Sequence, residues 1–224
     1  MNVRKRALAG LCLLCAFLSV PAGCGQTADK EGNPVSLTQE EVDRANEAFA
    51  SIVETSEGIF CASEISCFFT SHYGSPEEID FENFLYNCPA GVVLEDSDAA
   101  EFQAVISADA PLSDSTLPSE YPVPVHRYRK EEVSALLETY AGITVDALNS
   151  TEGVLYLEEY DSFYNFTSDS GAGIFQCVGG EKTGDMVRLW SDTSGYDGSM
   201  SVLTLQNVDG KYLIQSLERV ALEG

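Results

Sequence analysis

The side chains best suited to covalent chemistry in this sequence are a cysteine and two histidines. Cys67 precedes both histidines of the chain, His72 and His126. A thiol and an imidazole form a nucleophile and its general base when the fold brings them together, whatever their separation in the sequence. His72 lies close to an expected turn and His126 follows two prolines, and both settings are more typical of structural or exposed residues. We predict no catalytic residue, and a Cys/His hydrolase stays open as an alternative.

Carboxylates alternate with aromatic residues in YLEEYDSFYNF, a combination that sugar-binding surfaces and glycosidases use. In a hydrolase of this kind, Glu158 or Asp161 would be needed for turnover. Two observations favour a structural role instead. The chain has 36 acidic residues, so neighbouring carboxylates carry little information, and aromatic residues at strand spacing usually face a core or a cross-strand partner. The other members of this segment are Tyr156, Glu159, Tyr160, Phe163 and Tyr164.

The cysteines that follow residue 24 limit the metal and redox chemistry of the chain. None of them forms the C-x-x-C pair of zinc ribbons and thioredoxin-like sites. The sequence also lacks a G-x-S-x-G, an H-E-x-x-H and a phosphate-binding glycine loop. We therefore expect no metal and no cofactor, and we interpret residues 192–198 as a solvated turn. Disulfides are permitted outside the cytoplasm, and their pairing stays open among Cys61, Cys67, Cys88 and Cys177.

The N-terminus has the layout of a signal peptide. Three basic residues at positions 4–6 precede an apolar run over residues 7–20. That run is too short to span a bilayer. We expect residues 1–23 to be a signal peptide and the mature protein to lie outside the cytoplasm.

The residues around Cys24 resemble the lipobox of bacterial lipoproteins, because Ala and Gly directly precede the cysteine. The resemblance implies that Cys24 carries lipid as the first mature residue, which anchors the protein to the outer face of the membrane. Residues 24–35 are polar and lack apolar periodicity, so we expect a flexible tether there. Pro21 stands where lipoboxes favour Leu, Val or Ile, and plain secretion is the alternative.

The charge of the chain excludes some partners. The sequence has 12 Lys plus Arg against 36 Asp plus Glu, a net charge of −24. Without the three basic residues of the signal peptide, 9 basic and 36 acidic residues give −27. Such a surface repels nucleic acid and anionic lipid headgroups, so we expect no nucleic-acid partner. Because 44% of the residues are hydrophobic, a packed core is expected.

Four helices are expected from caps and periodicity. In residues 37–53, Thr38 and Glu41 form a capping box ahead of an apolar face that includes Phe49, Ile52 and Val53. The other three helices are expected over residues 75–88 with Ser75 as the cap, over residues 98–107, and over residues 129–142 with Gly142 ending the helix.

From residue 153 the pattern changes to short strands. Segments rich in aliphatic and aromatic residues alternate with Gly, Asp and Ser, with a tight turn at NVDGK and a looser one at GGEKTGD (179–185). The predicted fold class is α+β, with N-terminal helices packed on a C-terminal antiparallel sheet. We expect one domain over residues 36–224, with a possible subdivision near residues 108–120.

Three stretches resemble sequences of uncharacterised predicted lipoproteins from anaerobic Gram-positive bacteria: YPVPVHRYRKEEVSALLETYAGIT, YLEEYDSFYNFTSD and DGKYLIQSL. The resemblance implies a location and no activity. We expect a lipid-anchored binding or interaction module whose protein or small-molecule partner the sequence does not specify. An extracytoplasmic hydrolase using carboxylates or a Cys/His pair, and a structural or assembly factor of the cell envelope, are the alternatives.

Overall fold

The computed structural model describes residues 32–54, 56–109, 114–166, 171–191 and 199–221. The chain forms two compact units. The terminal unit contains the described residues of 1–50 and 175–224, and the central unit those of 51–174. The expected signal peptide, Cys24, nearly all of the expected tether and the expected turn at 192–198 lie outside the described residues. Residues 114–120, part of the expected subdivision, lie inside the central unit.

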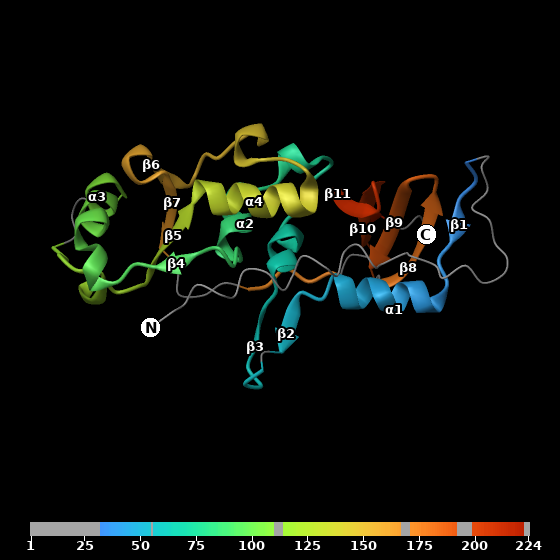
Figure 1. Cartoon of the computed structure of the whole chain (residues 1–224), viewed down its shortest axis with the longest axis horizontal. Helices are drawn as coiled ribbons and strands as arrows, with labels where there is room; N and C mark the ends of the chain where they lie inside the picture. Colours follow the sequence, from blue (N-terminus) through green and yellow to red (C-terminus); the bar gives the residue numbers. More distant parts are fainter. Residues whose placement is uncertain (1–31, 55, 110–113, 167–170, 192–198, 222–224) are drawn as a thin grey trace. The chain divides into compact units, whose positions relative to one another are not determined.

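The terminal unit begins with β1 (Val35–Ser36) and α1 (Gln39–Ala48). The predicted cap of α1 is confirmed, because the Thr38 side chain accepts from the Glu41 backbone N–H and the Glu41 carboxylate accepts from the Thr38 backbone N–H. Helix α1 packs against β8 (Cys177–Thr183) (Figure 1). Lys182 on β8 also donates a hydrogen bond to Glu41, which fixes the first turn of the helix to the sheet.

The expected end of this helix was wrong. Residues Ile52–Glu54 form the strand β2, which pairs with β3 (Phe60–Ala62) in a two-stranded antiparallel sheet. Ile52 and Val53 are exposed there and do not extend the apolar face of α1. β-branched side chains favour the extended backbone over the helix, so the apolar spacing over residues 37–53 overstated the length of the helix.

The sheet of the terminal unit has five strands in the order β1-β8-β9-β10-β11. β9 covers Met186–Ser191, β10 Ser199–Val208 and β11 Lys211–Ala221, and all neighbours pair antiparallel. The tight turn is confirmed, because Asp209 and Gly210 lie between paired Val208 and Lys211, both with positive φ. The looser turn lies within the predicted segment but is shorter, because β8 continues to Thr183 and only Gly184 and Asp185 separate it from β9.

The central unit contains α2 (Phe81–Tyr86), α3 (Ala99–Asp109) and α4 (Lys130–Ala141). Gly142 ends α4 in the left-handed conformation, as predicted. The second predicted helix start was wrong, since Ser75 precedes only a short 3-10 turn and Asp80 caps α2 by accepting from the Asn83 backbone N–H. The 3-10 turns of this unit are η3 (Glu64–Phe69), η4 (Pro76–Glu78), η5 (Asp96–Asp98), η6 (Pro118–Glu120), η7 (Val145–Ala147) and η8 (Glu158–Tyr160).

A second antiparallel sheet organises the central unit, with strand order β4-β5-β7-β6. Its strands are β4 (Val92–Val93), β5 (Val125–Arg129), β6 (Leu155–Leu157) and β7 (Ser162–Phe166). Helices and antiparallel sheets together make the protein α+β, as predicted. The strands after residue 153 do not form one sheet, however, because β7 pairs with β5 and β6 in the central sheet, whereas β8 to β11 belong to the other sheet.

Register divides the side chains of this central sheet between two faces. Arg127 on β5 pairs with Tyr164 on β7, and Tyr128 pairs with Phe163. Directly opposed residues share a face and successive residues alternate, so Arg127 and Tyr164 lie on one face and Tyr128 and Phe163 on the other. Tyr164 packs with Phe102, Val105 and Ile106 of α3. We call this face the α3 face and the opposite one the Phe163 face.

Candidate functional site

The Phe163 face ends in a cleft beside the exposed ring of Tyr156. Tyr156 on β6 pairs with Phe163 on β7, and their ring centroids lie 4.8 Å apart at an interplanar angle of 43°. Phe163 is buried against Phe81 of α2, whereas Tyr156 is 38% exposed. The cleft has a volume of about 450 Å³, within the range of roughly 300–1,000 Å³ that small-molecule sites occupy. An exposed aromatic ring that packs against a buried one therefore lines a cleft of ligand size.

Asp161 holds the phenol of Tyr156 in place. The Tyr156 hydroxyl donates a 2.6 Å hydrogen bond to Oδ1 of Asp161. This bond to the carboxylate raises the pKa of Tyr156, so the phenol keeps its proton at neutral pH. Asp161 has φ of 45° and its carbonyl accepts from the Lys130 backbone N–H at 3.0 Å. One residue thus orients the aromatic ring and joins η8 to the start of α4.

Lys130 brings the only described cation to the cleft, at the first residue of α4. Its Nζ lies 2.6 Å from Oδ1 of Asp146 in η7 and 6.0 Å from the centroid of the Tyr156 ring. The hydrogen bond to Asp146 raises the pKa of Lys130, so the ammonium stays charged. An ammonium has three donors, and Asp146 is bonded to it through one oxygen. Both groups of the ion pair keep hydrogen-bonding capacity for a ligand.

A polar loop completes the cleft. Residues 149–152 line it, after Asn149 is fixed through its backbone N–H to the Glu77 carbonyl at 2.8 Å. Ser150 accepts from the Glu152 backbone N–H at 3.0 Å. The side chains of Asn149 and Thr151 make no hydrogen bond to another described residue. The cleft therefore offers an amide and a hydroxyl that the described part of the fold does not use.

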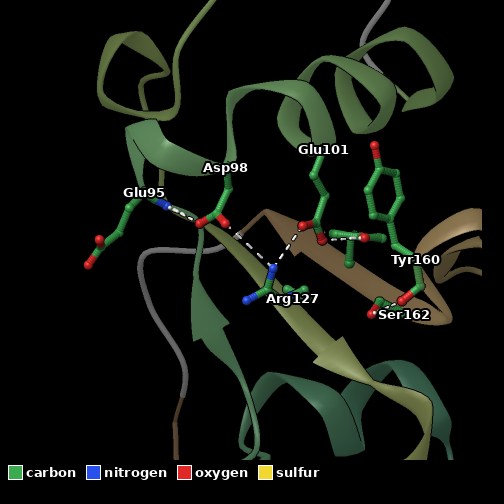
Figure 2. A network of polar contacts seen from close by, with 7 residues as sticks. Glu95, Asp98, Glu101, Arg127, Tyr160 and Ser162 are labelled. Atoms are coloured by element: carbon green, nitrogen blue, oxygen red, sulfur yellow. Dashed lines mark hydrogen bonds and ion pairs between the residues drawn. The ribbon is translucent and has the colours of Figure 1, made fainter. Parts of the chain in front are cut away.

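The α3 face carries a separate polar network, which Figure 2 shows between α3 and the sheet. The Arg127 guanidinium lies 2.7 Å from Oε2 of Glu101 and 3.8 Å from Oδ1 of Asp98. The Tyr164 hydroxyl donates to the second Glu101 oxygen at 2.6 Å. Burial and this bond to Glu101 raise the pKa of Tyr164 above its usual range. Asp98 is itself fixed by accepting from the Glu95 backbone N–H at 3.0 Å.

This network has a structural role. Glu101 is 8% exposed and lies among the apolar residues of α3 and the sheet, with both of its oxygens hydrogen-bonded. A buried carboxylate needs such partners to offset its desolvation. Its charged groups are engaged with one another, so we place the candidate binding site in the Tyr156 cleft.

The chain matches no family model, curated protein or solved structure.

The aromatic and acidic segment does not form one surface. Tyr156 and Phe163 belong to the cleft, whereas Tyr164 points to α3. Tyr160 packs beside the same apolar cluster as Tyr164. Asp161 is committed to Tyr156, and Glu158 and Glu159 are exposed in η8. The sequence thus indicated part of the cleft, but it gave no signal for Lys130, Asp146 or Asn149, which belong to elements outside that segment.

The Cys67 thiol lacks the surroundings of a nucleophile. It is buried and donates to the Glu64 carbonyl at 3.1 Å. Burial raises the pKa of Cys67 well above its usual range and the pKa of Cys88 to about 12, so neither forms a thiolate near neutral pH. Burial also lowers the pKa of His126. The four described cysteines are free thiols, of which Cys61 is exposed and Cys177 belongs to the terminal unit.

No described helix has the length and apolar character needed to cross a membrane. Among the described residues, no group of three or more His, Cys, Asp or Glu side chains is arranged to hold a metal ion.

Proposed function

We propose that the protein is a lipid-anchored, extracytoplasmic binding module that takes a small polar ligand in the Tyr156 cleft. The observation that carries this proposal is the free hydrogen-bonding capacity of Lys130, Asp146 and Asn149 next to a rigid, exposed aromatic ring. Binding sites combine such a supported apolar surface with a few polar groups that fix the orientation of the ligand.

The location is part of the same proposal. A lipid on Cys24 would place the protein on the outer face of the membrane, followed by the tether of residues 24–35. The terminal unit comes next in the sequence, with its N-terminal helix α1 packed on β8 of the C-terminal sheet. The net charge of −24 makes nucleic acid an unfavourable partner.

The anchor is tested by Cys24→Ser. We expect the unchanged chain to fractionate with membranes and to carry the mass of a diacylglyceryl cysteine at its N-terminus. Cys24→Ser should remove both properties because no other thiol is expected to accept the lipid. Cys61→Ser is the matched control, since it replaces an exposed thiol in β3. A soluble product with another N-terminus, insensitive to Cys24→Ser, would contradict the anchor.

The binding function is tested by recovering ligands. The detergent-extracted protein is purified from its native envelope, and small molecules that co-purify are identified by mass spectrometry. Lys130→Ala should lose them because it removes the cation of the cleft, while Lys211→Ala, in the terminal unit, should keep them. Equal recovery from both variants would place binding elsewhere.

A hydrolase is the second candidate, and one observation favours it. Two carboxylates, Asp146 and Glu152, line the same cleft, and paired carboxylates perform acid–base catalysis on bound substrates. The test is turnover of a ligand that binds. Loss of turnover with retained binding in Asp146→Asn or Glu152→Gln would favour the hydrolase, and an unmodified ligand recovered after long incubation would favour the binding module.

A further inference from the structure

The Tyr156 ring has the properties of a stacking platform for a ligand. Its neighbour Phe163 is buried, its hydroxyl is fixed by Asp161, and 38% of the residue is exposed beside the cleft. The face of an aromatic ring is the negative end of its quadrupole. C–H groups that point to one side of a saturated ring carry partial positive charge and are attracted to this face. A side chain that is already fixed by packing and by a hydrogen bond loses little conformational entropy when it binds a ligand.

The ion pair of the cleft distinguishes between classes of polar ligand. Lys130 and Asp146 are already in contact at 2.6 Å. An anionic ligand gains Lys130 but meets the charges of Asp146 and Glu152, and a cationic ligand gains those two carboxylates but meets Lys130. A zwitterion such as an amino acid must separate the existing pair to use both charges.

A neutral hydroxyl avoids these costs because it donates and accepts at once. Neighbouring hydroxyls can accept from the Lys130 ammonium and donate to the Asp146 carboxylate while the two remain paired. The unused side chains of Asn149 and Thr151 offer further donors and acceptors of the same kind. A ring with C–H groups on one face and hydroxyls along its edge matches both parts of the cleft.

We propose that the ligand of the Tyr156 cleft is a neutral saccharide, with a pyranose ring stacked on Tyr156 and its hydroxyls bridging Lys130 and Asp146. This inference rests on the proposed binding function and narrows its ligand to one chemical class. It assigns Tyr156 to stacking and Asp161 to positioning the ring.

The test measures binding of defined probes to the full chain in detergent by isothermal titration. The saccharide probes are cellobiose, maltose, lactose and N,N′-diacetylchitobiose. The charged probes are glucuronic acid, glucosamine and free amino acids. We expect at least one neutral disaccharide to bind, and Tyr156→Ala to weaken it by about tenfold or more. Tyr156→Phe keeps the ring and should retain most of the affinity.

Phe60→Ala is the matched control, because Phe60 is a 71% exposed aromatic residue on β3, outside the cleft. It should leave saccharide binding unchanged, and the melting temperature of each variant checks its fold. Saccharide binding that survives Tyr156→Ala in full would overturn the inference. Binding of an amino acid alone, lost in Tyr156→Ala, would overturn the saccharide class and keep the binding function. If no probe binds and no native ligand co-purifies, both proposals fail.

Discussion

The hydroxyl of Tyr164 on β7 donates a 2.6 Å hydrogen bond to Oε1 of Glu101 on α3, 63 residues earlier in the sequence. The other oxygen of the same carboxylate is held by Arg127 on β5. Glu101 therefore connects its helix to two adjacent strands within the apolar cluster of the α3 face. This buried connection adds directional contacts to the apolar packing of α3 on the central sheet.

Removing the hydroxyl of Tyr164 should destabilise the central unit. Tyr164→Phe leaves one oxygen of a buried carboxylate without its donor, which typically costs about 1–3 kcal/mol. Arg127→Met should cost more, about 3 kcal/mol or above, because it removes the only described cation paired with Glu101. The free energy of unfolding is measured by urea titration with circular dichroism.

Tyr160→Phe is the control for the Tyr164→Phe and Arg127→Met variants. Its hydroxyl lies near the network in Figure 2 but makes no hydrogen bond to a described residue. Its removal should change the free energy of unfolding by less than about 0.5 kcal/mol. Equal effects at Tyr160 and Tyr164 would show that the network does not hold α3.

A glycine tests the packing between the end of the central unit and η3. A Cβ at Gly173 would lie 2.3 Å from the carbonyl carbon of Phe69 and 2.6 Å from the Thr70 nitrogen. Backbone atoms cannot move aside as a side chain can, so Gly173→Ala should lower the free energy of unfolding by about 1–3 kcal/mol. Gly171→Ala is matched to it, with no atom within 4 Å of the added carbon. Identical melting temperatures for the two variants would refute the close approach.

The ion pair of the terminal unit should make its stability depend on pH. Burial alone would raise the pKa of Glu41, but hydrogen bonds from Lys182 and Thr38 outweigh burial and hold the pKa below its usual value of 4.5. A carboxyl group whose pKa is lower in the folded chain than in the unfolded chain stabilises the fold at pH values above its unfolded pKa. This stabilisation is lost as the pH falls through its folded pKa.

Glu41→Gln should therefore be less stable than the unchanged chain near pH 7, and this difference in stability should narrow as the pH falls below about 4.5. The single tryptophan, Trp190 on β9, reports unfolding of this unit by fluorescence. A difference that stays constant as the pH falls would show that Glu41 is not stabilised by Lys182.

The four described thiols should differ in reactivity. Only Cys61 is exposed, whereas burial raises the pKa of Cys67, Cys88 and Cys177. Iodoacetamide near pH 8 should therefore modify Cys61 first, and the other three only after addition of guanidinium chloride. Peptide mass spectrometry gives the extent of modification at each position. Alkylation of Cys67 at the rate of Cys61 in the folded protein would contradict its burial.

Local signals in the sequence were reliable where a few neighbouring residues decide the structure. Thr38 with Glu41, Gly142, and Asp209 with Gly210 all have the predicted conformations. Each depends on hydrogen bonds or φ values within a few residues. The predicted helix end near Ile52 was wrong because Ile52 pairs with Ala62 in a β-sheet, and this pairing competes with the helix. Helical periodicity is read within one segment and takes no account of a pairing partner elsewhere in the chain.

The cleft was only partly visible in the sequence for the same reason. The segment around Tyr156 and Asp161 drew attention to sugar-binding chemistry, but which aromatic side chains share a face depends on how β7 pairs with β5 and β6. Lys130 enters the cleft because its backbone N–H is bonded to Asp161 across the sheet end. Such long-range pairings are set by the whole fold, and propensity or spacing within one segment does not reveal them.

The division of the chain between its two units has a consequence for the order of folding. The central unit is continuous, so all of its residues are available once the chain has emerged as far as residue 174. The terminal unit is discontinuous in the sequence, so the apolar face of α1 stays uncovered until β8 is available. For a chain that emerges N-terminus first, α1 is therefore among the last segments to become native. Loops of this length slow folding, so the early helix stays open to chaperones and proteases until the C-terminal strands arrive.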